Sequence, residues 1–186
     1  MANKRSDSLT RFRELVKKDY RRINGKKRER EKRDLLDWYV DNCPAHEGPE
    51  TAKKFADYGI RFGYDFKKIK KRILDVVGLK EDNTYKYCSN GSEMEALIDE
   101  IEKIYSSRRK AVIYFSKGSY GEIDSLYIRI RNSFAHGNYF KVGDFYYLWN
   151  ETGSEVKTKK LGAFMVLKYS DLKSIYDALS TADDKA

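Results

Sequence analysis

The change in the spacing of apolar residues along the chain is the feature that most constrains its fold. Before Gly137, apolar residues recur at every third or fourth position, which is the spacing of one buried face of an α-helix. The segments with this spacing are 8–23, 28–42, 51–63, 64–77, 92–105 and 122–137. After Gly137 the period changes, and the segments 145–149, 156–161 and 163–169 have strand character. This pattern predicts a mainly α chain, with a small antiparallel β element at about 140–169 and a last short helix that Ser170 can cap.

Glycine and serine residues mark the expected helix ends. Gly78 and Gly137 each follow an apolar helical stripe, as a C-terminal cap does. Ser92 begins the pattern of a capping box, in which a side chain accepts a hydrogen bond from the first turn of a helix. Residues 79–91 are expected to be a loop. Residues 111–115 either continue the preceding helix or form a short strand, and both interpretations stay open.

Positive charge is concentrated at the N-terminus. The chain holds 38 Lys and Arg against 29 Asp and Glu, a formal net charge of +9. Residues 1–33 hold 14 of the basic side chains and 5 of the acidic ones, so the remainder is balanced. We therefore divide the chain into a basic N-terminal helical segment (1–28), a helical domain (29–182) and a tail (183–186). The excess favours contact with nucleic-acid phosphates, with a solvated helix pair as the alternative.

A second basic surface is expected on the 64–77 helix, where residues 67–72 include five Lys and Arg. Together with the 51–63 helix it weakly resembles a helix-turn-helix pair. DNA binding therefore stands as a further possibility for this part of the chain.

Several classes of protein and site are not expected. No stretch approaches the roughly 20 apolar residues of a membrane span, and the charged N-terminus lacks the apolar region of a secretory signal. Cys43 and Cys88 make no disulfide framework, and Cys43 with His46 has no second pair of ligands for a zinc ion. We expect a cytoplasmic protein without a membrane partner, a metal site or a cofactor.

The stretch from Arg131 to Gly137 carries the chemistry. Asn132 and His136 are one turn apart on the same face of a helix, and Arg131 lies beside Asn132, near the edge of the buried stripe. An imidazole can act as a general base or acid near neutral pH, and a guanidinium can hold a phosphate and stabilise its developing charge. Phosphodiester cleavage needs these groups, and no metal is required when the ribose 2′-OH is the nucleophile.

These residues resemble the Arg-x4-His motif of the HEPN superfamily, with Asn132 as the polar residue after the arginine and Ala135 and Gly137 as typical flanks. The resemblance implies a HEPN-like helical bundle that dimerises through its motif helices and cleaves RNA without a metal. Arg131 and His136 would act on the attack of the 2′-OH, and Asn132 would orient the histidine or the phosphate. The products would be a 2′,3′-cyclic phosphate and a 5′-OH. Many such proteins act in prokaryotic defence or toxin systems, so an antitoxin or defence partner is expected.

Other interpretations of the same residues remain open. Arg131 and His136 could simply cap a helix C-terminus, where cations are favoured. Some HEPN domains have lost activity and serve as dimerisation, nucleic-acid-binding or protein-interaction modules. Aromatic residues after His136 could stack on unpaired bases or pack as one face of a strand. The residues predicted to contact RNA are Arg21, Arg22, Lys26, Lys27, Arg28, Lys67, Lys70, Lys71, Arg129, Tyr139 and Lys141.

Overall fold

A mixed five-stranded sheet forms the centre of the molecule. The computed structural model describes residues 5–22, 29–44, 53–61, 63–107, 110–118, 121–153 and 159–180. The strands follow the order β1-β2-β5-β4-β3 across the sheet. β1 and β2 are parallel, and the other neighbouring pairs are antiparallel. Their bounds are Tyr85–Cys88 (β1), Val112–Ser116 (β2), Tyr139–Val142 (β3), Phe145–Thr152 (β4) and Lys160–Lys168 (β5).

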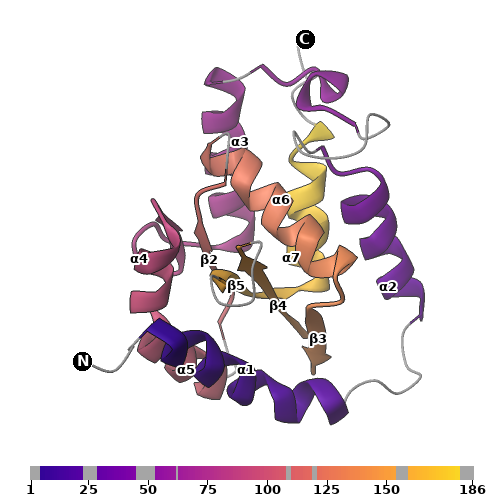
Figure 1. The fold of residues 1–186 in the computed structure, drawn as a ribbon. Coiled ribbons are helices and arrows are strands. Elements are labelled where there is room, and N and C mark those ends of the chain that lie inside the picture. The colour runs from indigo at the N-terminus through magenta and orange to yellow at the C-terminus, as the bar shows by residue number, and fades with distance from the viewer. Residues whose placement is uncertain are drawn as a thin grey trace.

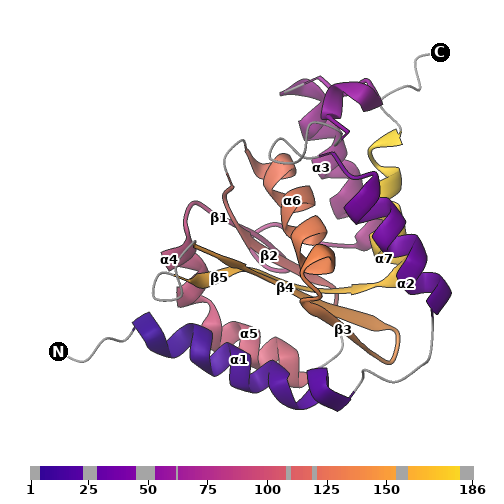
Figure 2. The same ribbon diagram turned by 45° about the vertical axis from the view of Figure 1, so that its right-hand side comes forward.

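Helices lie on both sides of this sheet, as Figures 1 and 2 show. One side carries α1 (Arg5–Arg22), α4 (Gly91–Ala96) and α5 (Ile98–Ser107). On the other side α6 (Glu122–Ala135) and α7 (Tyr169–Asp177) pack on the sheet. Around these two helices lie α2 (Glu29–Leu36), the π-helical segment η1 (Asp37–Asp41), the short 3₁₀ segment η2 (Phe55–Tyr58) and α3 (Tyr64–Val77).

The predicted mainly α bundle is wrong, because the chain folds as a mixed α/β structure around one sheet. The antiparallel element expected at 140–169 is present as β3, β4 and β5, but β2 and β1 extend it. Every residue of β2 is buried, since helices cover both of its faces. A buried strand therefore lacks polar alternation and cannot be told from a helix by spacing alone. β1 lies within residues 79–91, which the sequence predicted to be a loop.

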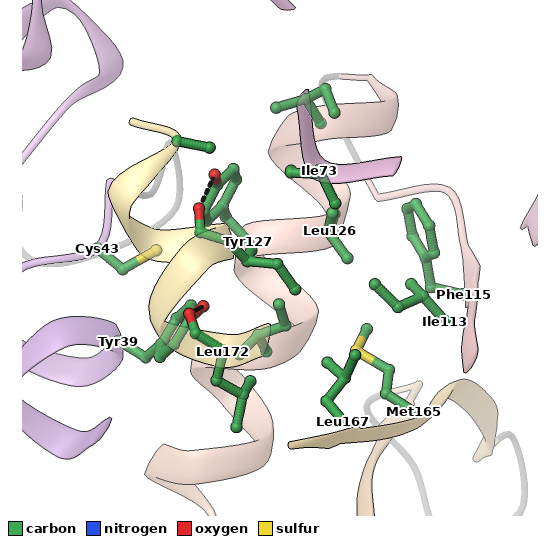
Figure 3. Close-up of a cluster of buried hydrophobic side chains, with 14 of the residues drawn as sticks. Tyr39, Cys43, Ile73, Ile113, Phe115, Leu126, Tyr127, Met165, Leu167 and Leu172 are labelled. Carbon is green, nitrogen blue, oxygen red and sulfur yellow. Dashed lines mark hydrogen bonds between the residues drawn. The ribbon is translucent and has the colours of Figure 1, made fainter. Parts of the chain in front are cut away.

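The sheet separates two apolar clusters. The larger one lies beneath α6 and α7 and includes Ile113 and Phe115 of β2. Figure 3 shows that two buried tyrosines from neighbouring elements form hydrogen bonds to the main chain of α7. The hydroxyl of Tyr127 donates to the carbonyl of Ile175, and that of Tyr39 donates to the carbonyl of Leu172, each at 2.6 Å. These bonds satisfy buried polar groups while the rings fill the core.

The second cluster joins α1 to the sheet. Leu9, Phe12 and Val16 of α1 are buried against residues of α4, α5 and the strands. The ring of Phe12 contacts the edges of Trp149 and Phe164 at centroid distances of 6.1 and 5.8 Å. The basic N-terminal helix therefore covers part of one face of the sheet, beside α4 and α5.

The other element predictions gave mixed results. The helices expected at 8–23, 64–77 and 122–137 are confirmed as α1, α3 and α6. The helix expected at 28–42 is present as α2 followed by η1. The last helix is confirmed as α7, although its first turn is capped by Asp171, whose carboxylate accepts the Lys168 N–H at 2.8 Å.

Three local predictions were wrong. The described part of 51–63 contains the 3₁₀ segment η2 in place of a helix, so residues 51–78 form no described helix-turn-helix pair. The cap of α4 is Asn90, whose side chain accepts the N–H groups of Ser92 and Glu93. The segment 92–105 is divided between α4 and α5, which are separated at Leu97.

Candidate functional site

The motif residues occupy the last turns of α6, the most enclosed helix of the fold. Nine of its 14 residues are buried, because β4 lies beneath it while η1, α2 and α3 pack around it. Phe134 stacks on Tyr39 of η1 at 5.7 Å and contacts Tyr139 of β3 at 4.9 Å. Solvent or a partner can therefore reach α6 mainly at its C-terminal end. A dimer formed through this helix could use only its final turns.

The end of α6 has a defined geometry. Gly137 has a φ of 68°, the left-handed conformation that favours glycine. The Gly137 N–H donates to the Phe134 carbonyl at 3.1 Å, and the Asn138 N–H donates to the Ser133 carbonyl at 2.8 Å. These two bonds make a Schellman motif, so the cap expected at Gly137 is confirmed. The motif turns the chain into β3 and leaves His136 at the helix end.

The imidazole of His136 is exposed at this end. Its main-chain N–H closes the helix by donating to the Asn132 carbonyl at 3.0 Å. The side chains of His136 and Asn132 make no hydrogen bond with any residue that the structure describes. Both ring nitrogens are therefore open to a ligand, beside a half-buried amide one turn earlier.

The Arg131 side chain is partly buried, and one of its hydrogen-bond donors lacks a partner among the described residues. Its Nε is shielded from solvent, yet that atom has no hydrogen-bond partner. Burial raises the pKa of the Cys43 thiol, and the nearby charge of Arg131 partly opposes this effect. The guanidinium thus lies near the end of η1. Within the described parts of the chain it forms no ion pair, and an unsatisfied buried donor costs about 1–3 kcal/mol.

Arg129, two positions earlier, lies on the opposite side of the helix and is buried. Its guanidinium donates to the Asn150 side chain at 2.9 Å, and to the Ser116 hydroxyl and the Lys117 carbonyl at 3.3 and 3.2 Å. It therefore links α6 to the ends of β2 and β4. Arg129 was predicted to contact RNA, and the structure instead places it in this network, since nothing in the sequence spacing marks Asn150 or Ser116 as its partners.

Two predicted RNA contacts follow the motif on β3. The ring of Tyr139 is half-buried against Phe134. Only 15% of the Lys141 side chain is exposed, and its ammonium pairs with Glu31 of α2 at 2.6 Å. The same carboxylate oxygen accepts the Tyr146 hydroxyl at 2.9 Å. Lys141 thus joins β3 to α2, whereas Tyr139 contacts Phe134 in the last turn of α6.

The lysines of α3 are not gathered at the motif. Lys70 pairs with Glu81 and, at 2.8 Å, with Glu122, which begins α6 at the opposite end from His136. Burial lowers the pKa of Lys70, but its hydrogen bonds to these two carboxylates raise it overall. Lys67 and Lys71 are exposed, and Lys71 lies 3.5 Å from Asp75.

The structure describes only some of the basic residues at the N-terminus. Arg21 and Arg22 belong to α1, but their side chains lie outside the description, as do residues 26–28 entirely. Other cations of α1 have partners within the molecule. Arg11 pairs with Glu102 and Asp99 of α5, and Arg13 pairs with Glu151 of β4. Some of the basic side chains of α1 therefore form ion pairs that hold this helix against α5 and β4.

The described residues contain no group of three or more His, Cys, Asp or Glu side chains that could hold a metal ion. His46 lies outside the described residues, and Cys43 is buried. Burial raises the pKa of Cys88 to about 11, so this thiol stays protonated at neutral pH. None of the helices in the described ranges is long and apolar enough to cross a bilayer.

Comparisons with known proteins found no relative of this chain: no family model, curated protein or solved structure matches it.

Proposed function

We propose that this protein is a metal-independent endoribonuclease whose site is formed by Arg131, Asn132 and His136. One observation carries the proposal: a half-buried guanidinium with an unpartnered Nε lies at the same helix end as an exposed imidazole. An unpaired, partly buried cation is stabilised by an anionic ligand from outside, and a phosphodiester is such a ligand. The proposal rests on these residues and their likeness to the HEPN motif. The mixed α/β fold, which is not a helical bundle, is not used to support it.

The groups at this helix end are sufficient for transesterification. The His136 imidazole takes the proton of a ribose 2′-OH, and the 2′ oxygen attacks the adjacent phosphorus. The bond from phosphorus to the 5′ oxygen breaks, and the leaving oxygen takes a proton from solvent. Arg131 neutralises the charge that develops on the phosphoryl oxygens. The products are a 2′,3′-cyclic phosphate and a 5′-OH, and the imidazolium returns its proton to solvent.

The accessory residues of this proposal lie near the motif or are exposed on the surface. Asn132 orients the imidazole or the phosphate, and Tyr139 offers a partly exposed ring for stacking on a base. Lys67 and Lys71 provide weaker, more distant attraction for the strand. A homodimer that pairs the C-terminal turns of two α6 helices would bring two copies of the site together. A cytoplasmic location and a role in defence or a toxin system belong to the same proposal.

The test is cleavage of RNA by the purified full chain in the presence of EDTA. His136→Ala and Arg131→Ala should each lower the cleavage rate by about a hundredfold or more, because each removes a group that acts in the transition state. Arg72→Ala is the matched control, since Arg72 is exposed on α3, and should cleave normally. Thermal unfolding of every variant reports whether the fold is retained.

The outcome also separates catalysis from binding alone. Cleavage products that end in a 2′,3′-cyclic phosphate support the proposed chemistry. Salt-sensitive RNA binding that is unchanged by His136→Ala, without any cleavage, would instead assign a non-catalytic nucleic-acid-binding role. Cleavage that persists at the full rate in both alanine variants would show that this helix end is not the active site.

A further inference from the structure

A cleft lined by three lysines lies at one end of the sheet, where β4 begins and β5 ends, and it contains none of the motif residues. Its volume is about 440 Å³, within the range of about 300–1,000 Å³ that is usual for small-molecule sites. Six parts of the chain meet there: the end of α3, the turn before β1, the residues before β2, the start of β4, the end of β5 and the first turn of α7. The lining residues include Lys80, Lys110, Lys168, Asn83, Thr84 and Phe145.

The three ammonium groups have no carboxylate partner among the residues that the structure describes. Neither Lys80, Lys110 nor Lys168 forms an ion pair with any described residue, in contrast to Lys70, Lys86 and Lys141 elsewhere in the fold. Asp171 is the one acidic residue among the lining residues. Its carboxylate accepts the main-chain N–H of Lys168 at 2.8 Å and so caps α7. Three like charges around one cleft raise its positive potential and favour an anion.

Hydrogen bonds hold part of the backbone around the cleft in place. The Lys80 carbonyl accepts the N–H groups of Thr84 and Tyr85 at 2.9 and 3.0 Å, and the Thr84 hydroxyl accepts the Lys80 N–H at 2.8 Å. Lys168 lies opposite Phe145 in the pairing of β5 with β4. A fixed site loses less conformational freedom when a ligand binds.

The other walls suit an organic group attached to the anion. The Phe145 ring is half-buried and belongs to the apolar residues that pack on the second cluster. The Lys168 ammonium lies 5.5 Å from the centroid of this ring. The Asn83 amide is exposed beside them and can both donate and accept hydrogen bonds. An aromatic ring, an amide and several ammonium groups together match a base and its phosphates.

We propose that this cleft binds a nucleotide, with its phosphates held by Lys80, Lys110 and Lys168 and its base against Phe145. The three lysines line one cleft of small-molecule size, which favours a single nucleotide over a strand. The cleft shares no residue with the site at Arg131 and His136. Its occupancy can therefore be measured without RNA cleavage, and the inference stands or falls separately from the proposed nuclease activity.

The test measures binding of ATP, inorganic pyrophosphate and a short single-stranded 2′-O-methyl RNA to the full chain by isothermal titration calorimetry. ATP and pyrophosphate should bind saturably. The triple variant Lys80→Ser, Lys110→Ser and Lys168→Ser should weaken both by about tenfold or more, because hydrogen bonds to charged groups are lost. The control variant Lys32→Ser, Lys103→Ser and Lys117→Ser removes three exposed lysines elsewhere and should bind as the wild type does.

A second substitution tests the role of the aromatic wall. Phe145→Leu keeps an apolar side chain and should weaken ATP more than pyrophosphate, since only ATP carries a base. The proposal is overturned if neither ATP nor pyrophosphate binds saturably, or if the two lysine variants bind ATP equally. It is also overturned if the RNA binds through these lysines while ATP does not, because the cleft would then hold a strand.

Discussion

Arg129 and Arg131 lie two positions apart on α6 but have opposite environments. The guanidinium of Arg129 is buried and makes hydrogen bonds to groups from β2, β4 and the residue after β2. That of Arg131 is half-buried and makes none with the described residues. At 100° per residue, two positions separate the side chains by about 200° around the helix. One arginine therefore faces the sheet and serves the fold, while the other is available to a ligand.

Replacing Arg129 by alanine should destabilise the protein. The change leaves the buried Asn150 side chain, the Ser116 hydroxyl and the Lys117 carbonyl without this donor, and each unsatisfied group costs about 1–3 kcal/mol. We expect the free energy of unfolding to fall by about 3 kcal/mol or more, measured by urea denaturation with circular dichroism. Arg72→Ala, on the exposed surface, should change it by less than about 0.5 kcal/mol. Equal effects of the two substitutions would contradict a structural role for Arg129.

The elements around the motif show how a helix end can be exposed although the helix is buried. Packing by β4, η1 and the neighbouring helices encloses α6, and the Schellman motif at Gly137 then turns the chain sharply into β3. His136 is the residue just before this turn. The conformation of Gly137 therefore determines both where the helix stops and how the imidazole is presented.

Gly137→Ala should destabilise the protein by about 1 kcal/mol, because a Cβ is disfavoured at a φ of 68°. Gly137→Asn should cost less, since asparagine tolerates the left-handed conformation. Gly91→Ala is the control: Gly91 begins α4, and the atoms nearest to an added Cβ belong to the Lys160 side chain, whose Cδ lies at 3.0 Å and can shift. This control should be neutral or stabilising. Thermal unfolding measures all three, and equal losses for Gly137→Ala and Gly137→Asn would argue against strain at this position.

At the scale of the whole molecule, the sequence could predict amphipathic elements but not their arrangement. α3 and α6 each have one apolar stripe and a glycine after it, so their bounds followed from spacing and caps. β2 is buried on both faces, and β1 contributes only four residues, so neither has the alternation that marks a strand. The motif at Arg131–Gly137 was visible as local sequence. The partners of Arg129 and the lysines of the cleft come from distant segments, which only the fold brings together.

Both ion pairs and apolar contacts hold the basic helix α1 against the rest of the molecule. The ion pairs of Arg11 are partly exposed, and such pairs contribute about 0–1 kcal/mol. Phe12 is fully buried against Trp149 and Phe164, and truncating a buried phenylalanine costs about 3–5 kcal/mol. Phe12→Ala should therefore lower the free energy of unfolding far more than Arg11→Ala does, in urea denaturation of the full chain. The Phe12 variant should also bind more of an apolar dye such as ANS, because a loosened α1 uncovers the sheet. A larger loss from Arg11→Ala would show instead that charge holds the N-terminal helix in place.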